Sequence, residues 1–266
     1  MLTLIGSAAA KQHFPDFREP KDIDYHSANP CVLITPEGEM RRDVFTDVRL
    51  AQWNWGEVAT ASELYTMKVS HSFWEIGDYK VRSANWRKHM SDVVFFQRKG
   101  VEFNRELYDI LLPIWKDIHK KNPTNLKQNA GNFFNDAVVR KYDHDSIHAS
   151  IAYNDHPLYE DILVPGEEVM VDSTKFFAGM DYETQLQLVR EEVYATALER
   201  IMIPNDYIGS PSQAYAWALQ RTITSLFKGE WALWTVLNYD TLARPDCNYV
   251  QRHLDNKNLL IPLEEA

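Results

Sequence analysis

The chain of 266 residues contains little cysteine, and its two cysteines, Cys31 and Cys247, lie far apart without the spacing of a metal site. A disulfide framework is therefore not expected, and a reducing cytoplasm fits the chain. Long apolar runs are also absent, and the apolar first ten residues lack the basic leader of a signal peptide. We thus expect a cytoplasmic protein with no membrane partner.

Positive charge is scarce too, because 38 Asp and Glu face 28 Lys and Arg, which gives a formal net charge of −10. Non-specific binding of polyanions depends on positively charged surface, so a broad nucleic-acid-coating surface is not expected. One stretch is locally basic and is expected to hold a nucleotide or a single RNA end: Arg82, Arg87, Lys88, Arg98 and Lys99.

What the chain does contain is ample apolar material, 45% of its residues, including 8 Trp, 13 Tyr and 12 Phe. This composition predicts a well-folded globular protein with room for one large domain or two modest ones. Short strands interleaved with helices are expected over residues 1–102, and mostly helices over residues 103–266. The predicted fold class is α+β, with a small mixed sheet followed by a mostly helical region.

The first residues predict a strand that runs directly into a helix. Met1–Ile5 is apolar and β-branched, Gly6-Ser7 is a typical strand break, and Ala8–Gln12 favours a helix. A helix that begins at Gly6-Ser7 would offer backbone N–H groups and a serine hydroxyl to an anion such as a nucleotide phosphate.

Two acidic residues follow at Asp22 and Asp24. On a strand, residues at i and i+2 project from the same face, so these carboxylates are expected to lie side by side. Because like charges repel, the pair predicts a bound cation. Mg²⁺, or Mn²⁺ in its place, suits oxygen ligands of this kind and leaves positions open for substrate phosphates.

The order of these residues resembles the signature of the polymerase-beta-type nucleotidyltransferase superfamily, in which Gly-Ser or Gly-Gly precedes a strand with Asp-x-Asp. Within it, the likeness is closest to the abortive-infection toxin branch of minimal nucleotidyltransferases, where Arg18 matches an arginine of the motif. Met67–His71 resembles the third motif, a strand with a lysine. Trp86–Val93 resembles the fourth, a basic helix that ends in an aspartate. The likeness covers roughly residues 1–98.

The resemblance implies transfer of a nucleoside monophosphate from an NTP to a hydroxyl acceptor such as an RNA end, a protein or a small molecule. It implies metal binding by Asp22 and Asp24, and charge compensation by Lys68. The other residues that it implies are Gly6, Ser7 and Arg18 for the nucleotide, and Lys88 and Asp92 to complete the site.

One element of the superfamily pattern is missing. A third carboxylate commonly lies on a later strand, but Leu64–His71, whose alternating pattern predicts such a strand, contains none. Asp43, Asp47 and Glu63 are nearby, yet none lies on a convincing strand opposite the pair. We expect either a site of two carboxylates completed by substrate, or altered or lost activity. On that strand Lys68 and His71 would face opposite sides.

Further elements are expected along the chain. Pro30–Pro36 reads as a strand and Glu168–Val171 as a short extended piece. Apolar residues at helical spacing predict helices over Trp86–Gln97, over Phe103–Lys120 despite Pro113, and over Asn132–Tyr153, Asp181–Met202 and Ser210–Leu242, the last interrupted at Gly229.

A second polar cluster, His144-Asp145 with His148, leaves three interpretations open. It is a helix start whose histidines are hydrogen-bonded at a domain contact, or it contributes with His71 to the nucleotide site. The third is a histidine-aspartate metal phosphohydrolase acting on nucleotides, with His71 or His89 and Asp172 as further ligands. A catalytically inactive nucleotide-binding protein on the transferase fold is the alternative without chemistry.

Overall fold

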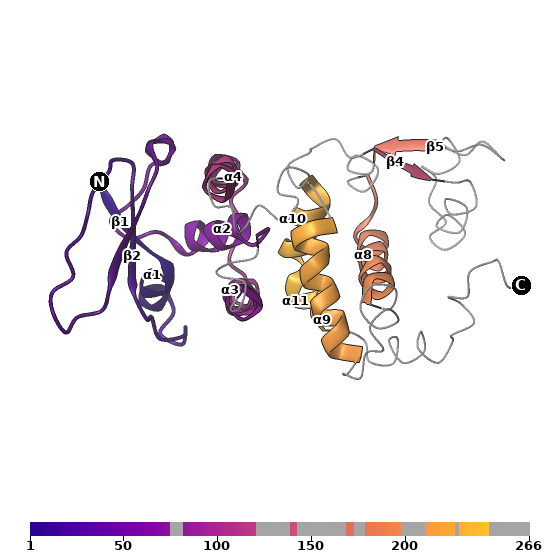
Figure 1. The fold of residues 1–266 in the computed structure, drawn as a ribbon, viewed down its shortest axis with the longest axis horizontal. Helices are drawn as coiled ribbons and strands as arrows, with labels where there is room; N and C mark the ends of the chain where they lie inside the picture. The colour runs from indigo at the N-terminus through magenta and orange to yellow at the C-terminus, as the bar shows by residue number, and fades with distance from the viewer. Residues whose placement is uncertain are drawn as a thin grey trace, which may run out of the picture. The chain divides into compact units, whose positions relative to one another are not determined.

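The computed structural model describes residues 1–74, 82–120, 139–142, 169–172, 179–197, 211–226 and 229–244. The chain forms two compact units, Met1–Ala130 and Gly131–Ala266, and each is described by itself. The fold class is α+β: a small mixed sheet at the N-terminus is followed by helices (Figure 1). The predicted boundary at residue 102 precedes α4 (Arg105–Lys120), which packs on α2 (Ala61–His71) within the first unit.

The sheet has three strands in the order β1 (Leu2–Ile5), β2 (Ile23–Ser27) and β3 (Arg42–Thr46). β1 pairs antiparallel with β2, and β2 pairs parallel with β3, so the sheet is mixed as expected. The outer edge of β1 is covered, because Leu4 exchanges backbone hydrogen bonds with Glu57 and Ala59. This arrangement puts β2, which carries Asp24, in the centre.

The connection from β2 to β3 contains no strand, so the strand predicted over Pro30–Pro36 is wrong. Two of its apolar side chains, Val32 and Ile34, are 90% and 85% exposed. A β-rich run forms a strand when it finds a pairing partner and a surface to cover, and here the side chains meet solvent. The strand of this region is β3 instead, after the turn at Gly38.

Helix α1 (Gly6–His13) follows β1 directly, as predicted, and contacts β2. Helix α2 replaces the strand that was predicted over Leu64–His71. Its start is fixed by a capping box, in which the Thr60 hydroxyl accepts from Glu63 N and the Glu63 carboxylate accepts from Thr60 N. That local signal, Thr-x-x-Glu, is stronger than the short alternation that favoured a strand.

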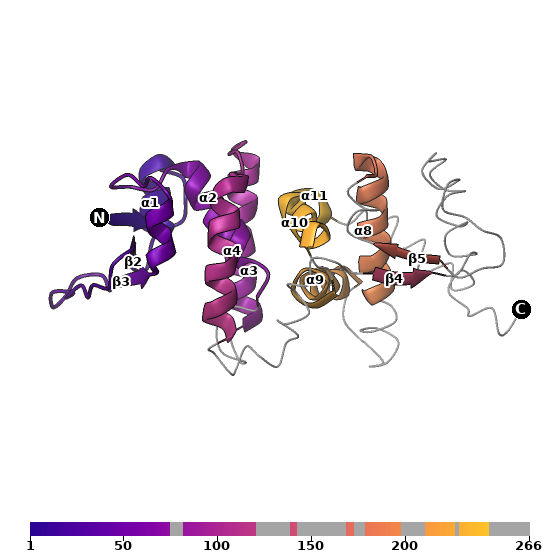
Figure 2. The same cartoon turned by 90° about the horizontal axis from the view of Figure 1, so that it is seen from above.

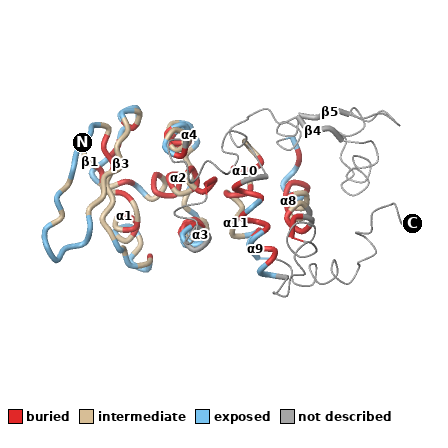
Figure 3. The backbone as a smooth tube through the Cα atoms, viewed as in Figure 1, coloured by how far each residue is buried: buried red, intermediate tan, exposed pale blue. Residues whose placement is uncertain are grey.

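Helix α2 is the buried centre of the helical layer in the first unit. It lies between α3 (Arg82–Arg98) and α4, and contacts both (Figures 1 and 2). Most of its residues are buried, as the tube in Figure 3 shows. The helices predicted over Trp86–Gln97 and Phe103–Lys120 are confirmed, the second with Pro113 inside it. A polar side chain on α2 is therefore held firmly between neighbours.

The part of the second unit that the structure describes is mainly helical. The two strands, β4 (Val139–Tyr142) and β5 (Val169–Asp172), pair antiparallel, so the helix predicted over Asn132–Tyr153 is wrong at β4, while the extended piece at Glu168–Val171 is confirmed. The helical segments are α8 (Tyr182–Thr196), α9 (Pro211–Arg221), the π-helix (Thr222–Leu226), α10 (Gly229–Leu237) and α11 (Tyr239–Leu242).

Among the described residues, no helix combines the length and the apolar character needed to cross a membrane.

Candidate active site

Three carboxylates meet at one end of the sheet. Asp24 on β2 and Asp43 on β3 are register partners of the parallel pair, and Asp22 directly precedes β2. One carboxylate oxygen from each lies within 4.8 Å of the other two, and all three residues are half-buried. Three convergent carboxylates at this separation can ligate one hard divalent cation.

Asp43 supplies the third carboxylate, so the expectation that no third acid lies on a strand opposite Asp22 and Asp24 is wrong. The missed signal was local: Arg42–Thr46 has a β-branched and aromatic alternation that starts shortly after a glycine turn. The acid was expected on the later segment at Leu64–His71, which is helical.

Gly6 makes room for this acid cluster. Its φ of +68° lies in the left-handed region, and a Cβ at this position would lie far inside van der Waals contact with the Asp24 carboxylate. Both facts require glycine. The absence of a side chain therefore lets the start of α1 approach Asp24 directly.

A buried ion-pair cluster lies next to the three acids. Asp92 on α3 accepts two hydrogen bonds from Arg18, from Nε to Oδ1 at 2.7 Å and from Nη2 to Oδ2 at 2.8 Å. Lys68 Nζ on α2 lies 2.9 Å from Asp92 Oδ2. The Asp92 side chain is 3% exposed. The structure thus brings together three residues that the resemblance implied for one site.

Asp24 and Asp92 differ in how easily they ionise. Burial, followed by repulsion from Asp22, raises the pKa of Asp24. Burial also opposes ionisation of Asp92, but its hydrogen bonds with Arg18 and the charge of Lys68 outweigh that effect and hold its pKa below the usual value. Asp92 is paired with two protein cations, whereas the three acids around Asp24 have one ion pair among the described residues, from the exposed Arg41 to Asp43 at 2.8 Å.

Two further lysines extend the positive charge around this cluster. Lys21 and Lys88 are exposed, and neither forms an ion pair within the described part of the chain. Desolvation, and then the positive charges of Arg18, Lys21 and Lys68, lower the pKa of Lys88, although Asp92 opposes this. Cations that crowd one another in this way favour an anionic ligand.

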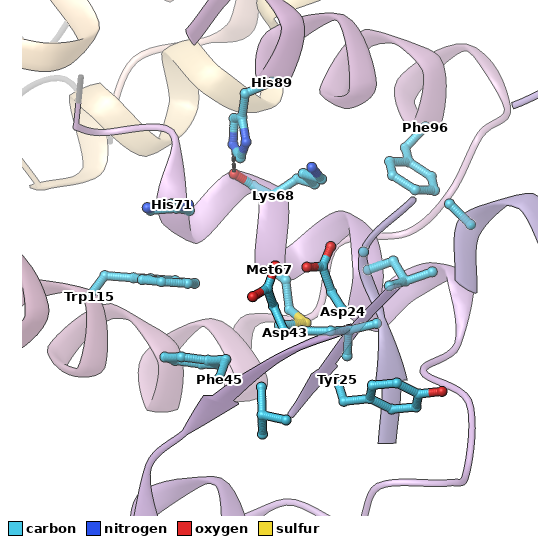
Figure 4. A pocket seen from close by; sticks show the side chains of 15 residues that line it. Asp24, Tyr25, Asp43, Phe45, Met67, Lys68, His71, His89, Phe96 and Trp115 are labelled. Atoms are coloured by element: carbon cyan, nitrogen blue, oxygen red, sulfur yellow. Dashed lines mark hydrogen bonds between the residues drawn. The ribbon is translucent and has the colours of Figure 1, made fainter. Parts of the chain in front are cut away.

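Lys68 and His71 lie on one side of α2, so the prediction that they face opposite sides is wrong. On a helix, residues at i and i+3 share a face. Both line a cavity of about 440 Å³ together with Asp24 and Asp43. Figure 4 shows the two carboxylates near Lys68, with Trp115 and His71 as nearly parallel rings to one side.

Aromatic rings stack in two groups, one lining this cavity and one next to it. Phe45 and Trp115 are parallel, with centroids 4.8 Å apart, and Trp115 stacks on His71 at 3.9 Å. His119 stacks in turn on Trp74 at 4.7 Å. No local sequence pattern singles out Phe45, Trp115 or His119, because they come from β3 and α4 and meet only in the fold.

The histidines of this region are neutral. His71 Nε2 lies 3.2 Å from His119 Nε2, so one of the two nitrogens donates to the other. Burial lowers the pKa of His71 well below its usual value and that of His119 to about 4. Burial also lowers the pKa of His89 to about 3, and its Nε2 donates to Lys68 O at 2.7 Å.

The proposed hydrolase set is divided between the two units. His144, Asp145 and His148 lie outside the described residues, and Asp172 ends β5 in the second unit. His71 and His89 each have one ring nitrogen engaged by another group in the first unit. For Gly6 and Ser7 the structure gives the expected strand-to-helix junction, with Ser7 buried.

Two family models match the chain, and the residues of the site are divided between the two matched segments. Residues 63–256 match the family model described as domain of unknown function DUF7275, and residues 2–50 match one described as domain of unknown function DUF7277. Because the first match spans more than half of the chain, the chain belongs to the DUF7275 family. The three acids lie in the second matched segment, and Lys68 and Asp92 in the first. No curated protein and no solved structure matches the chain.

Proposed function

We propose that this member of the DUF7275 family is a Mg²⁺- or Mn²⁺-dependent nucleotidyltransferase that moves a nucleoside monophosphate from an NTP to a hydroxyl acceptor, such as an RNA end. The observation that carries the proposal is the meeting of Asp22, Asp24 and Asp43 beside Gly6 and Lys68. The order of the sequence motifs supports it. The compartment that we propose is the cytoplasm, where Cys31 would persist as the exposed free thiol that it is.

The residues at the site fit a hard divalent cation. All three groups are carboxylates, the ligands that Mg²⁺ and Mn²⁺ prefer, and the raised pKa of Asp24 reflects burial and then repulsion that a cation would relieve. When bound, such an ion neutralises phosphate charge and lowers the pKa of the attacking hydroxyl. Asp22, Asp24 and Asp43 would hold it.

The chain's own groups would act on the phosphates. The first backbone N–H groups of α1, at Gly6 and Ser7, suit a phosphate oxygen. Lys68 supplies positive charge next to the acids and would offset charge that develops in the transition state. Asp92 is a positioning residue, because it fixes Arg18 and Lys68 by ion pairs. Lys88 would add long-range attraction for the triphosphate.

Label transfer tests this function. The purified chain is incubated with each α-labelled NTP, Mg²⁺ or Mn²⁺, and a mixture of RNA and protein acceptors. We expect transfer by the wild type, and a transfer rate lower by about 10²- to 10³-fold or more in Asp22→Asn, Asp24→Asn and Asp43→Asn. Each variant should remain folded, as a thermal unfolding transition would show. Asp109→Asn is the matched control, because Asp109 is an exposed acid that pairs with Arg105 on α4.

Three outcomes would overturn the proposal. Full transfer by an Asp22→Asn, Asp24→Asn double variant would remove the acids from the chemistry. Release of phosphate without label transfer would indicate a phosphohydrolase. Binding of NTP without turnover under every acceptor would indicate an inactive nucleotide-binding protein.

A further inference from the structure

The cavity beside the acids is the size of a small-molecule site, and its wall is largely apolar. Its volume of about 440 Å³ is within the range of small-molecule sites, about 300–1,000 Å³. At one end lie Asp24 and Asp43, and the rest of the wall is aromatic and apolar apart from Lys68 and two histidines. A nucleotide whose phosphates reach the acids would place its base against this wall.

Several N–H donors of the lining side chains are engaged by other groups of the protein. Lys68 Nζ pairs with Asp92, and Trp115 Nε1 donates to Ser70 Oγ at 3.0 Å. His71 shares its Nε2 with His119. The Tyr25 ring points away from the other labelled side chains in Figure 4. Apart from the remaining protons of Lys68, the wall therefore has few donors to offer to a ligand.

His89 contributes an acceptor to the same cavity. Its Nε2 lies 2.7 Å from Lys68 O, and a carbonyl oxygen only accepts, so Nε2 carries the proton. Burial lowers the pKa of this ring to about 3, so it is neutral at pH 7 and Nδ1 carries a lone pair. Within the described part of the chain, Nδ1 has no hydrogen-bond partner. His89 can accept a hydrogen bond from a ligand and cannot donate one.

We infer that the cavity selects adenine or cytosine, which carry an amino group at C6 or C4, over guanine and uracil, which carry a carbonyl at the equivalent position. An amino group donates to His89 Nδ1, whereas a carbonyl oxygen would face a second lone pair. A buried acceptor that meets an acceptor leaves both unsatisfied, and polar mismatches of this kind give strong discrimination. The inference rests on the proposed function, because it takes the bound molecule to be a nucleotide.

ATP and ITP form the sharpest pair of ligands, because ITP has a carbonyl in place of the adenine amino group. We would measure binding of ATP, CTP, GTP, UTP and ITP to the full chain with Mg²⁺ by calorimetry. We expect ATP and CTP to bind at least about tenfold more tightly than GTP, UTP and ITP, the scale of one buried hydrogen bond. Equal binding of ATP and ITP, or a preference for GTP or UTP, would overturn the inference.

A matched pair of variants assigns the selectivity to His89. His89→Phe keeps a ring of similar size and removes the lone pair, so the ratio of ATP to ITP affinity should fall below about threefold. His26→Phe is the control, because His26 is also buried, at 2% exposure, but does not line the cavity; its ratio should match the wild type. An unchanged ratio in a folded His89→Phe variant would overturn the role of His89. If that variant does not fold, the ATP and ITP comparison on the wild type decides.

The two proposals fail separately. Label transfer without discrimination between amino and carbonyl bases contradicts the inference and leaves the transferase intact. Selective binding without transfer contradicts the transferase and supports the base site. No binding of any of the five nucleotides at millimolar concentration overturns both.

Discussion

Asp24 and Asp92 both lie near Lys68, yet the fold treats them in opposite ways. Asp92 is almost fully buried and is paired with Arg18 and Lys68, and its pKa is lowered. Asp24 is half-buried beside two other acids, and its pKa is raised. The first arrangement is electrostatically complete within the protein. The second keeps three acids together with one ion pair, from the exposed Arg41 to Asp43, so an added cation would relieve the repulsion that remains.

Neutralising Asp92 should produce the largest loss of stability. Asp92→Asn leaves Arg18 and Lys68 without their carboxylate, and because both cations are partly exposed we expect a loss of about 2–3 kcal/mol in the free energy of unfolding. Urea denaturation measures it. The exposed pair Arg105–Asp109 offers the control, since Asp109→Asn should change the stability by less than about 0.5 kcal/mol. Equal effects in the two variants would contradict the comparison.

Substitution of Gly6 should disturb the acid cluster from the backbone side. Gly6→Ala has to accept a φ of +68° and displace the Asp24 carboxylate, whereas Gly100→Ala has a nearly identical φ of +67° with nothing within 4 Å. Gly100→Ala should cost about 1–2 kcal/mol from the backbone alone, and Gly6→Ala should cost more. Titration with Mg²⁺ separates them further, because only Gly6→Ala should weaken the ion's binding. Equal Mg²⁺ affinity in both variants would show that the approach of Gly6 to Asp24 is irrelevant.

Removing the charge of Asp24 should change the free energy of unfolding least, and it should raise stability where the two other substitutions lower it. Because the folded pKa is raised, ionisation of Asp24 lowers stability as the pH rises above its ordinary value near 3.8. Without metal, Asp24→Asn should therefore gain stability relative to the wild type as the pH rises, by less than about 1 kcal/mol at pH 7. Asp92→Asn should show the reverse, because the folded pKa of Asp92 is lowered. The higher stability of the wild type over this variant should be lost as the pH falls below the ordinary value near 3.8.

Thermal unfolding with EDTA and then with Mg²⁺ extends this test. Added Mg²⁺ should raise the melting temperature of the wild type and of Asp109→Asn, since an ion that binds only the folded state stabilises it. It should leave Asp24→Asn nearly unchanged. A Mg²⁺-dependent rise of the same size in Asp24→Asn would place the ion elsewhere.

The parts of the site that are close in sequence could be predicted, and those that depend on pairing could not. The strand, the Gly6-Ser7 break and the acids Asp22 and Asp24 are contiguous signals, and the structure places them as expected. Asp43 was missed because its position opposite Asp24 depends on a parallel pairing across a long connection. No local pattern specifies that pairing.

The helix α2 illustrates the reverse error. A short alternation favoured a strand over Leu64–His71, although Thr60 and Glu63 form a capping box that identifies a helix start. Correcting this element changes the chemistry, because Lys68 and His71 then share one side and both line the cavity. The His71–His119 contact joins α2 to α4, and neither helix alone indicates it.

The register of β2 on β3 has a consequence for folding. Asp24 and Asp43 are direct partners, and a slip of one residue would turn Asp43 to the opposite face of the sheet. The acid cluster therefore forms only when the two strands have found their correct alignment. A divalent cation present during refolding would favour that alignment over alignments shifted by one residue. The ion would thus help to select the correct strand pairing before any substrate binds.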